Sequence, residues 1–575
     1  MKARALSLFG LSLALFAAGV FAQSPAAELP FKFEKNVMIP MRDGTQLAAN
    51  IFSPKEGGPF PVILQRTPYG KMDAKSGEAK HYCAAGYVLI AQDCRGRGAS
   101  QGTWEPFRYD GDDGFDTQEW IGHQPWCNGH IGTSGGSYVG WTQWAAASRA
   151  SRFLTCMAPV VPFTDSYHEI AAPGGAMQLS LAFGWGAGVG GLHLEPAQLL
   201  KALNLLPLKT WDEQAGKHIF FLQDWVAHPT YDDYWRARGL DGHYERVAVP
   251  VLNIGGWYDI FSKPTFDHVT KVRQTSTNLF ARRHQCVVMG PWGHGVGGQK
   301  LGELDFGANA RRDVGKLQFE WFEHWLKHKE NGVSDWPAVR LFVMGENVWR
   351  NEAEWPLART QFTPWYLHGA GQANTRHGDG SLSPTIPAAE PADQFSYDAA
   401  NPVPTKGGNN LLAVPAGPFD QSAIEERPDV MVFTSTPLEK AMEVTGPVKV
   451  ILHAASSAPD TDFTAKLVDV YPDGKAYNLC DGIQRARYRE SFTQPTLIKP
   501  GQTYRYEIDL WVTSNLFQPG HRIRLEISSS NFPRFDRNPN TGHDFGADAE
   551  LAKAQQTIFH DRAHPSYVLL PIIPR

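Results

Sequence analysis

The chain has 575 residues, a formal net charge of −5 and 42% hydrophobic residues. This length exceeds what one hydrophobic core can organise, so we expect two or three domains. The 18 Trp and 32 Phe exclude a disordered chain, because they supply ample apolar surface to bury. The slight acidity argues against nucleic acid as a partner.

The first 22 residues have the pattern of a secretion signal. Lys2 and Arg4 precede an apolar stretch over 6–16, and small residues end at Ala22. The stretch is too short to span a membrane, and no later segment is long and apolar enough. We therefore expect cleavage after Ala22 and a periplasmic or secreted protein. The six cysteines show no disulfide or metal-ligand spacing, so free buried cysteines are expected.

Residues 23–165 alternate apolar, strand-like runs with polar or helical segments. Val62–Leu64 and Tyr87–Ala91 are two such runs. Alternation of this kind is typical of a parallel sheet with helices on both faces. We assign one α/β domain to 23–165 and 246–350.

The segment Gly135–Gly140 carries the strongest chemical signal. Ser137 stands on a glycine-flanked turn between a β-rich run (130–134) and a helix-forming run (141–147). Such a turn raises a serine hydroxyl above the sheet, and the N-terminus of the next helix offers N–H groups to an oxyanion. Ser137 is therefore the predicted nucleophile.

Ser134 is the alternative nucleophile, because Gly132–Gly136 also has the form G-x-S-x-G. A helix starting after Ser134 would begin with two glycines, each about 1 kcal/mol less favourable than alanine in a helix. With Ser137, those glycines fall in the turn. Helix propensity therefore favours Ser137 as the nucleophile. The G-x-S-x-G pattern by itself does not exclude Ser134.

Two further strand ends supply the partners that a nucleophilic serine needs. Asp259 follows the apolar run 249–254, and His294 follows the apolar run 285–289. The order Ser, Asp, His is that of α/β-hydrolases, and the carboxyl ends of parallel strands share one edge of the sheet. We predict that Ser137 attacks an acyl carbonyl, His294 moves the proton and Asp259 orients His294.

Residues 166–245 exceed the length that one crossover requires, and their apolar runs are helix-like. We expect a helical cap over Ser137. Four tryptophans of this region serve either as cap core or as substrate contacts, since pockets are also lined with aromatic residues. They are Trp185, Trp211, Trp225 and Trp235.

Residues 351–575 differ from the preceding chain in composition and in hydrophobic pattern. Gly, Pro and Asn rise between 368 and 420, and strict alternation follows in 504–512 and 522–527. Alternation is typical of half-buried antiparallel strands, and many such strands between turns indicate a β-sandwich.

Five motifs together resemble the superfamily of cocaine esterase and Xaa-Pro dipeptidyl-peptidase, which also holds cephalosporin acylases and α-amino acid ester hydrolases. They are Gly-Gly-Ser137-Tyr-Val-Gly, Gly-Trp-Tyr-Asp259, Gly-Pro-Trp-Gly-His294, Arg66–Lys71 and Asp93–Gly98. The resemblance covers nearly all of the chain after residue 22. It implies a jelly-roll C-terminal domain and an oxyanion hole formed by the Tyr69 hydroxyl and the Tyr138 backbone N–H. A phenol suits this role because it is a neutral donor.

The resemblance also bears on the substrate. In α-amino acid ester hydrolases, acids two and three places after the triad aspartate bind the substrate ammonium, whereas this chain has Phe261 and Ser262 there. We therefore expect an esterase or amide acylase with an apolar acyl pocket to which Trp257 and Tyr258 contribute. The alternatives are an Xaa-Pro dipeptidyl-peptidase and a non-catalytic binding module. No cofactor or metal is implied, and the choice between ester and amide and the oligomeric state stay open.

Overall fold

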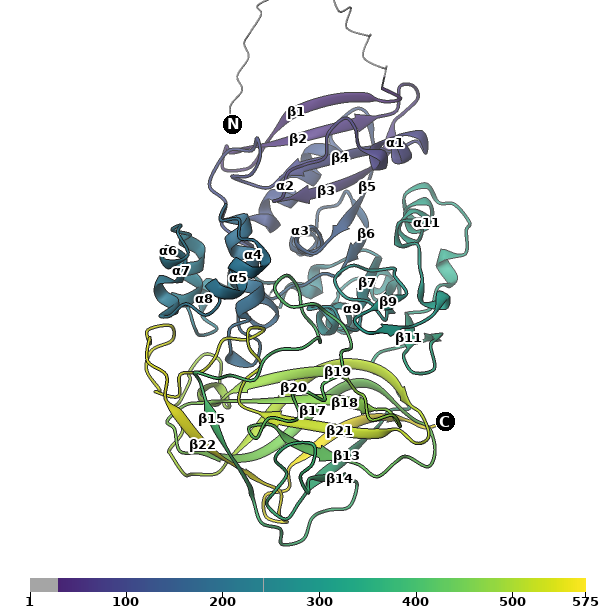
Figure 1. Cartoon of the computed structure of the whole chain (residues 1–575). Helices are drawn as coiled ribbons and strands as arrows, with labels where there is room; N and C mark the ends of the chain where they lie inside the picture. The colour runs from purple at the N-terminus through teal and green to yellow at the C-terminus, as the bar shows by residue number, and fades with distance from the viewer. Residues whose placement is uncertain (1–28, 241) are drawn as a thin grey trace, which may run out of the picture.

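The computed structural model describes residues 29–240 and 242–575. The expected secretion signal, 1–22, lies outside the described residues. Figure 1 shows three parts: an N-terminal sheet flanked by helices, a group of short helices to one side, and a large C-terminal sheet assembly below.

A ten-stranded sheet organises the N-terminal part. Its central strands, from β4 to β11, are parallel. Strands β2 and β12 run antiparallel to them, and the edge strand β1 pairs antiparallel with β2. In spatial order the strands are β1 (Lys32–Pro40), β2 (Gln46–Ser53), β4 (Val88–Asp93), β3 (Phe60–Thr67), β5 (Cys127–Gly136), β6 (Leu154–Val160), β7 (Val251–Gly256), β8 (Gln285–Gly290), β11 (Val339–Val343) and β12 (Val348–Glu352). Strands covered on both faces are buried along their whole length and mostly apolar, as β7 and β8 are.

Helices cover both faces of this sheet. One face carries α1 (Gly77–Ala84) and α11 (Val314–Lys327), which pack on residues such as Ile63 and Ala158. The opposite face carries α2 (Asp110–Gly122), α3 (Tyr138–Ala147) and α9 (Ser262–Thr275), and α10 (Leu279–Arg283) contacts α9. The two faces follow the side-chain alternation of the strands.

Short helices fill the chain between β6 and β7, where the cap was expected. They are η1 (Tyr167–Ala171), η2 (Pro173–Gly175), α4 (Leu179–Val189), α5 (Pro196–Ala202), η3 (Leu208–Thr210), α6 (Trp211–Gln214), α7 (Phe220–Ala227), α8 (Asp233–Arg236) and η4 (His243–Arg246). Trp211, Trp225 and Trp235 are each 1% exposed and form the core of this group. Trp185 is half-buried and contacts the candidate site.

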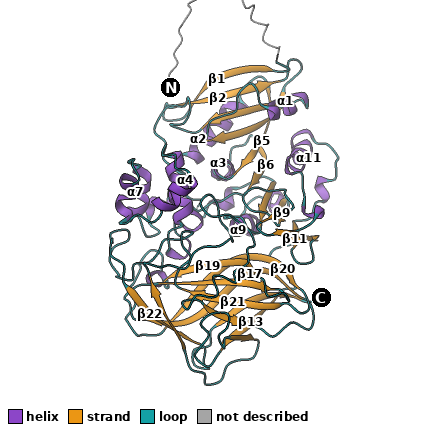
Figure 2. Ribbon diagram, in the orientation of Figure 1, coloured by secondary structure: helices purple, strands orange, loops and turns teal. Residues whose placement is uncertain are grey.

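The C-terminal part is built almost entirely of strands and loops, as Figure 2 shows. Its eleven-stranded sheet runs β15 (Asp393–Asp398), β22 (Lys553–Phe559), β17 (Met442–Ser456), β23 (Tyr567–Ile573), β13 (Gln361–His368), β14 (Ser381–Ser383), β16 (Met431–Thr434), β21 (Arg522–Ser528), β18 (Asp462–Val470) and β19 (Ala476–Arg485), with β20 (Tyr504–Phe517) paired to β17. Its inner faces enclose the largest hydrophobic cluster of the described chain.

One expectation for this part is wrong. The alternation in β21 predicted a half-buried strand, but Arg524 is 8% exposed and Glu526 is 4% exposed. The long segment between β15 and β16 covers the polar face and supplies Glu425, which pairs with Arg524 at 2.5 Å, while Lys466 of β18 pairs with Glu526. Charged side chains tolerate this burial because each has a partner of opposite sign.

All six cysteines lie in the described residues and are unpaired, and five of them are buried. Among the described residues, no helix is long and apolar enough to cross a bilayer.

Candidate active site

Ser137 lies between β5 and α3 with φ 59° and ψ −123°. This left-handed φ is rare for a residue with a side chain and costs on the order of 1–2 kcal/mol. The Ser137 N–H donates to the Val160 carbonyl at 3.0 Å, which ties the turn to β6. Gly135 is required here, since its φ is +122° and a Cβ would collide with Val139. Ser137 is half-buried at the carboxyl edge of the sheet.

Ser134 lies within β5, three residues before the turn. Its side chain is buried, and its hydroxyl accepts a hydrogen bond from Gln65 Nε2 at 2.9 Å. It therefore has neither the backbone geometry nor the exposure of a residue on a nucleophile turn.

Asp259 and His294 are brought together from the ends of two neighbouring strands, β7 and β8. His294 Nδ1 lies 2.6 Å from Asp259 Oδ2. Asp259 is 0% exposed, and its other oxygen accepts the Phe261 backbone N–H at 2.8 Å. The His294 side chain is 18% exposed, so its ring reaches the site on one side and the carboxylate on the other. A buried carboxylate at Nδ1 fixes the tautomer that leaves Nε2 free to accept a proton.

Asn409, from the C-terminal part, holds the turn that carries Asp259. Its side-chain amide donates to the Asp259 carbonyl at 2.7 Å, to the Trp257 carbonyl at 3.0 Å and to Ser262 Oγ at 3.1 Å. Asn409 is 2% exposed. Sequence reasoning missed this residue, because it is 150 positions away from Asp259 and belongs to no local motif.

Tyr69 follows β3 and faces the nucleophile turn. Its hydroxyl accepts the Trp185 indole N–H at 3.0 Å and lies near the Ser137 side chain. The residue is 51% exposed, but desolvation of its phenol end raises the Tyr69 pKa above its ordinary value. The phenol therefore stays protonated at neutral pH and can donate to an oxyanion.

Tyr138 contributes its backbone and its ring in different ways. As the first residue of α3, it has an N–H at the helix end where such groups lack intrahelical partners. Its ring is buried, and the hydroxyl donates to Asp110 Oδ2 at 2.7 Å and accepts the Phe107 N–H at 3.0 Å. Burial, with the nearby Asp110 charge second, raises the pKa of Tyr138 well above its usual range. The side chain thus fixes the position of the first turn of α3.

The motif Asp93–Gly98 supports the Tyr69 loop. Arg97 donates to the Pro68 carbonyl at 2.7 Å and to the Val189 carbonyl at 3.0 Å, joining this loop to α4. Lys71 pairs with the buried Asp93.

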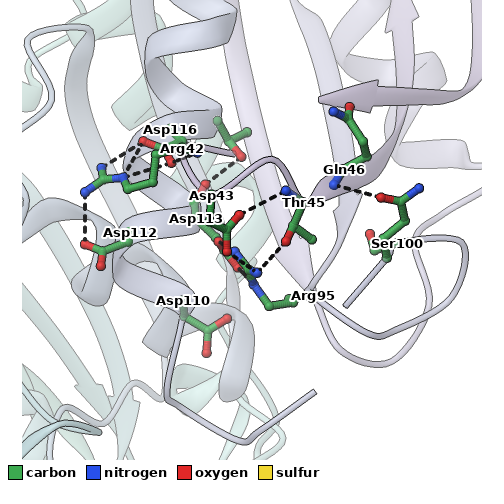
Figure 3. Close-up of polar contacts among 12 residues, drawn as sticks. Arg42, Asp43, Thr45, Gln46, Arg95, Ser100, Asp110, Asp112, Asp113 and Asp116 are labelled. Atoms are coloured by element: carbon green, nitrogen blue, oxygen red, sulfur yellow. Dashed lines mark hydrogen bonds and ion pairs between the residues drawn. The ribbon is translucent and has the colours of Figure 1, made fainter. Parts of the chain in front are cut away.

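Arg95, in the same motif, connects the start of α2 to the β1–β2 turn. It binds Asp113 at 2.5 Å and Asp43 at 2.6 Å, as Figure 3 shows. Both carboxylates are held by one planar guanidinium, which presents several donors in a fixed geometry. Arg95 of this motif therefore has a structural role: it links α2 to the β1–β2 turn.

An aromatic wall lies beside Tyr69 on the side of the short helices. The Trp185 ring stacks on Phe107 at a centroid distance of 5.8 Å and on Tyr138 at 6.1 Å. Trp104 meets Trp185 edge-on at 5.9 Å. Phe107 and Trp104 are buried behind Trp185, so Trp185 is the ring that this wall presents beside Tyr69, and it suits an uncharged acyl group.

The prediction that Trp257 and Tyr258 line the substrate pocket is wrong. Trp257 is 0% exposed, donates to the Phe342 carbonyl and packs on Phe266. Tyr258 is 1% exposed, and its hydroxyl donates to the Asn478 carbonyl of β19. Both side chains point from the turn into the junction with the C-terminal part. The aromatic neighbour of His294 is instead Phe261, at a centroid distance of 5.8 Å.

Within the described residues, no group of three or more His, Cys, Asp or Glu has the arrangement of a metal site. A serine on a strand–turn–helix, with an Asp–His pair at the same edge of a mainly parallel sheet, defines a serine hydrolase.

Comparison with known proteins gives the family. The X-Pro dipeptidyl-peptidase (S15 family) profile matches residues 43–296, and the X-Pro dipeptidyl-peptidase C-terminal non-catalytic domain matches 331–569. Cocaine esterase from Rhodococcus sp. (strain MB1 Bresler) is 39% identical, covering 95% of this chain and 99% of its own. The chain belongs to this S15 family of serine hydrolases.

Two solved structures share the whole architecture. An aminopeptidase from a marine sediment archaeon, Thaumarchaeota archaeon, has a TM-score of 0.82 at 25% identity and covers 97% of this chain and 99% of its own. An α-amino acid ester hydrolase has a TM-score of 0.81 at 26% identity and covers 97% and 100%. Both the catalytic part and the mostly-sheet C-terminal part therefore match the family.

Proposed function

We propose that the protein hydrolyses carboxylic esters through an acyl-enzyme on Ser137. Ser137 Oγ attacks the acyl carbonyl while His294 takes its proton, and Asp259 stabilises the imidazolium that forms. The Tyr69 hydroxyl and the Tyr138 N–H stabilise the oxyanion. The 2.6 Å Asp259–His294 pair at the edge that also carries the Ser137 turn is the observation on which this proposal depends most.

The acyl group we propose is uncharged and apolar. The wall of Trp185, Phe107 and Trp104 lies next to Tyr69, and the positions after Asp259 carry Phe261 and Ser262. An ammonium on the acyl side would find no carboxylate at these two positions, so only the weaker attraction of aromatic rings would offset its desolvation. The esterase named among the relatives favours an ester over a peptide as the natural bond.

An assay of two substrates tests this choice. We expect turnover of a p-nitrophenyl acyl ester to exceed that of Gly-Pro-p-nitroanilide by a wide margin, and Ser137→Ala to abolish both. Ser134→Ala serves as the matched control and should retain activity. Dominant release of p-nitroaniline would instead indicate an Xaa-Pro dipeptidyl-peptidase, and activity lost with Ser134→Ala but retained with Ser137→Ala would assign the nucleophile to Ser134.

The same proposal assigns roles to the parts of the chain. We infer a hydrolase domain over 23–165 and 246–350, a cap over 166–245 and a jelly-roll domain over 351–575. The contacts of Asn409 and Asn478 with the turn at 257–262 support a positioning role for the C-terminal domain. Cleavage after Ala22 and a periplasmic or secreted location complete the proposal and rest on the sequence of the first 22 residues.

A further inference from the structure

The turn that carries Ser137 needs support on both sides of the serine. Gly135, with a φ of +122°, and Gly136 come directly before it, and glycines give a backbone access to many conformations besides the observed one. Ser137 itself has a left-handed φ, which persists only where surrounding contacts determine it. The bond from the Ser137 N–H to the Val160 carbonyl fixes the middle of the turn. Other contacts must therefore hold its two ends.

Gln143, on the second turn of α3, contacts both ends. Its side-chain Nε2 donates to the Gly135 carbonyl at 3.0 Å and to the Val139 carbonyl at 3.1 Å. Gly135 stands two residues before Ser137, and Val139 stands two residues after it. One amide group therefore joins the end of β5 to the first turn of α3 across the nucleophile.

The amide of Gln143 is held in one orientation. Carbonyl oxygens only accept hydrogen bonds, so the end of the amide that faces the two carbonyls is its NH2 group. The Thr133 hydroxyl of β5 donates to the other end, Gln143 Oε1, at 3.0 Å. Gln143 and Thr133 are each 3% exposed, so the loss of one of these bonds would leave a buried polar group without a partner.

We infer that Gln143 is a positioning residue, which sets the spacing between the Ser137 hydroxyl and the Tyr138 N–H. The inference rests on the proposed function, in which this hydroxyl attacks the ester and this N–H stabilises the oxyanion. Tyr138 links Ser137 to Val139, so a shift of the Val139 carbonyl moves the Tyr138 N–H relative to the nucleophile. A buried side chain acts on the reaction through the turn alone, because it does not reach the substrate.

Gln143→Met tests the inference, because methionine fills a similar volume and donates no hydrogen bond. We expect kcat on a p-nitrophenyl ester to fall about 10- to 100-fold, with KM within about twofold, since misplacement by about 1 Å slows the reaction without altering the binding surface. Labelling by a fluorophosphonate should slow by a similar factor, because the probe needs the same hydroxyl and the same oxyanion donor. Thr133→Val removes only the bond to Gln143 Oε1 and should lower kcat by a smaller factor.

Gln285→Met is the matched control. Gln285 is 0% exposed, and its Nε2 also donates to two carbonyls, that of Val249 at 3.0 Å and that of Ala281 at 2.8 Å. It is the first residue of β8, whose other end leads to the His294 loop. This variant should lose thermal stability, as Gln143→Met does, but keep the wild-type kcat and labelling rate.

Equal losses of kcat in Gln143→Met and Gln285→Met, or a loss in Gln143→Met confined to KM, would overturn the inference. If Gln143→Met does not fold, Thr133→Val decides, and a wild-type kcat in that variant would overturn it too. Labelling of wild-type Ser137 without turnover of any ester would contradict the proposed function alone, because the labelling rates of the variants still compare how the hydroxyl and its oxyanion donor are placed.

Discussion

At the scale of single residues, the site depends on a strained serine backbone that its neighbours maintain. The left-handed φ of Ser137 persists because its N–H is bonded to β6 and because Gly135 gives the Val139 side chain room. Strain of this kind is stable only when surrounding contacts determine it. The hydroxyl is thereby presented at the edge of the sheet, near Tyr69.

Asp259→Asn should keep the fold and remove most of the activity. The amide can still pack in the buried site, but its NH2 group can face His294 Nδ1 and favour the wrong tautomer. We expect kcat to fall by about 10³- to 10⁴-fold with little change in KM. Steady-state kinetics on a p-nitrophenyl ester measures this, and a loss below about tenfold would mean that Asp259 does not orient the base.

Tyr69→Phe tests the oxyanion hole. The ring and its contact with the aromatic wall remain, and the donor to the oxyanion is lost. We expect a fall in kcat of about 10²- to 10³-fold, because one preorganised donor contributes to the transition state and little to ground-state binding. A rise in KM with unchanged kcat would show instead that Tyr69 only binds substrate.

The sequence predicts the catalytic residues of the site but not the directions of all the side chains around them. Ser137, Asp259 and His294 each follow a strand of the parallel sheet, and the shared carboxyl edge brings them to one place without knowledge of the loops. The directions of Trp257 and Tyr258 could not be predicted, because the turn after β7 can present a side chain to either the pocket or the domain junction. Tertiary packing against β19 and β11 decides for the junction.

At the scale of elements, the turn at 257–262 is held by another domain. Its acid must stay within hydrogen-bonding distance of His294, and Asn409 fixes three groups of this turn. Such a contact between segments 150 residues apart appears in no local pattern. The strands and helices could therefore be predicted from the sequence, whereas the contacts of Asn409 that hold the 257–262 turn could not.

Asn409→Ala should reduce kcat by about tenfold or more, because a loosened acid misplaces the base. The acidic limb of the kcat pH profile should shift, which a purely structural role would not produce. Asn410→Ala is the matched control: Asn410 is also 2% exposed, and its amide bonds to Gly407 within its own loop. Equal losses of kcat in both variants, with unshifted profiles, would contradict the positioning role of Asn409.

At the scale of the whole molecule, three parts meet around a cavity of about 540 Å³. Charged residues from the short helices, α9 and the C-terminal strands line it, among them Glu169, Lys263 and Asp509. Glu169 is 8% exposed and accepts the backbone N–H groups of Thr164 and Asp165. Burial, with the Asp165 charge second, raises its pKa to about 7.

Glu169 should make stability fall as pH rises. Its folded pKa of about 7 lies above the ordinary value of 4.5, so the native state binds more protons between these values. The resulting stabilisation is complete below about pH 4.5 and is lost as pH rises to about 7. We expect Glu169→Gln to gain about 1–3 kcal/mol relative to wild type between pH 5 and pH 8. Thermal unfolding of both proteins across this range measures the difference, and parallel Tm curves would contradict it.

Covalent labelling tests most directly whether Ser137 is the nucleophile. The protein is incubated with a fluorophosphonate, and the adduct is located by peptide mass spectrometry, with Ser137→Ala as the control. We expect one adduct, on Ser137, and none in the variant, because only a serine activated by His294 and Asp259 attacks the probe. An adduct on Ser134, or no adduct on the folded protein, would contradict it.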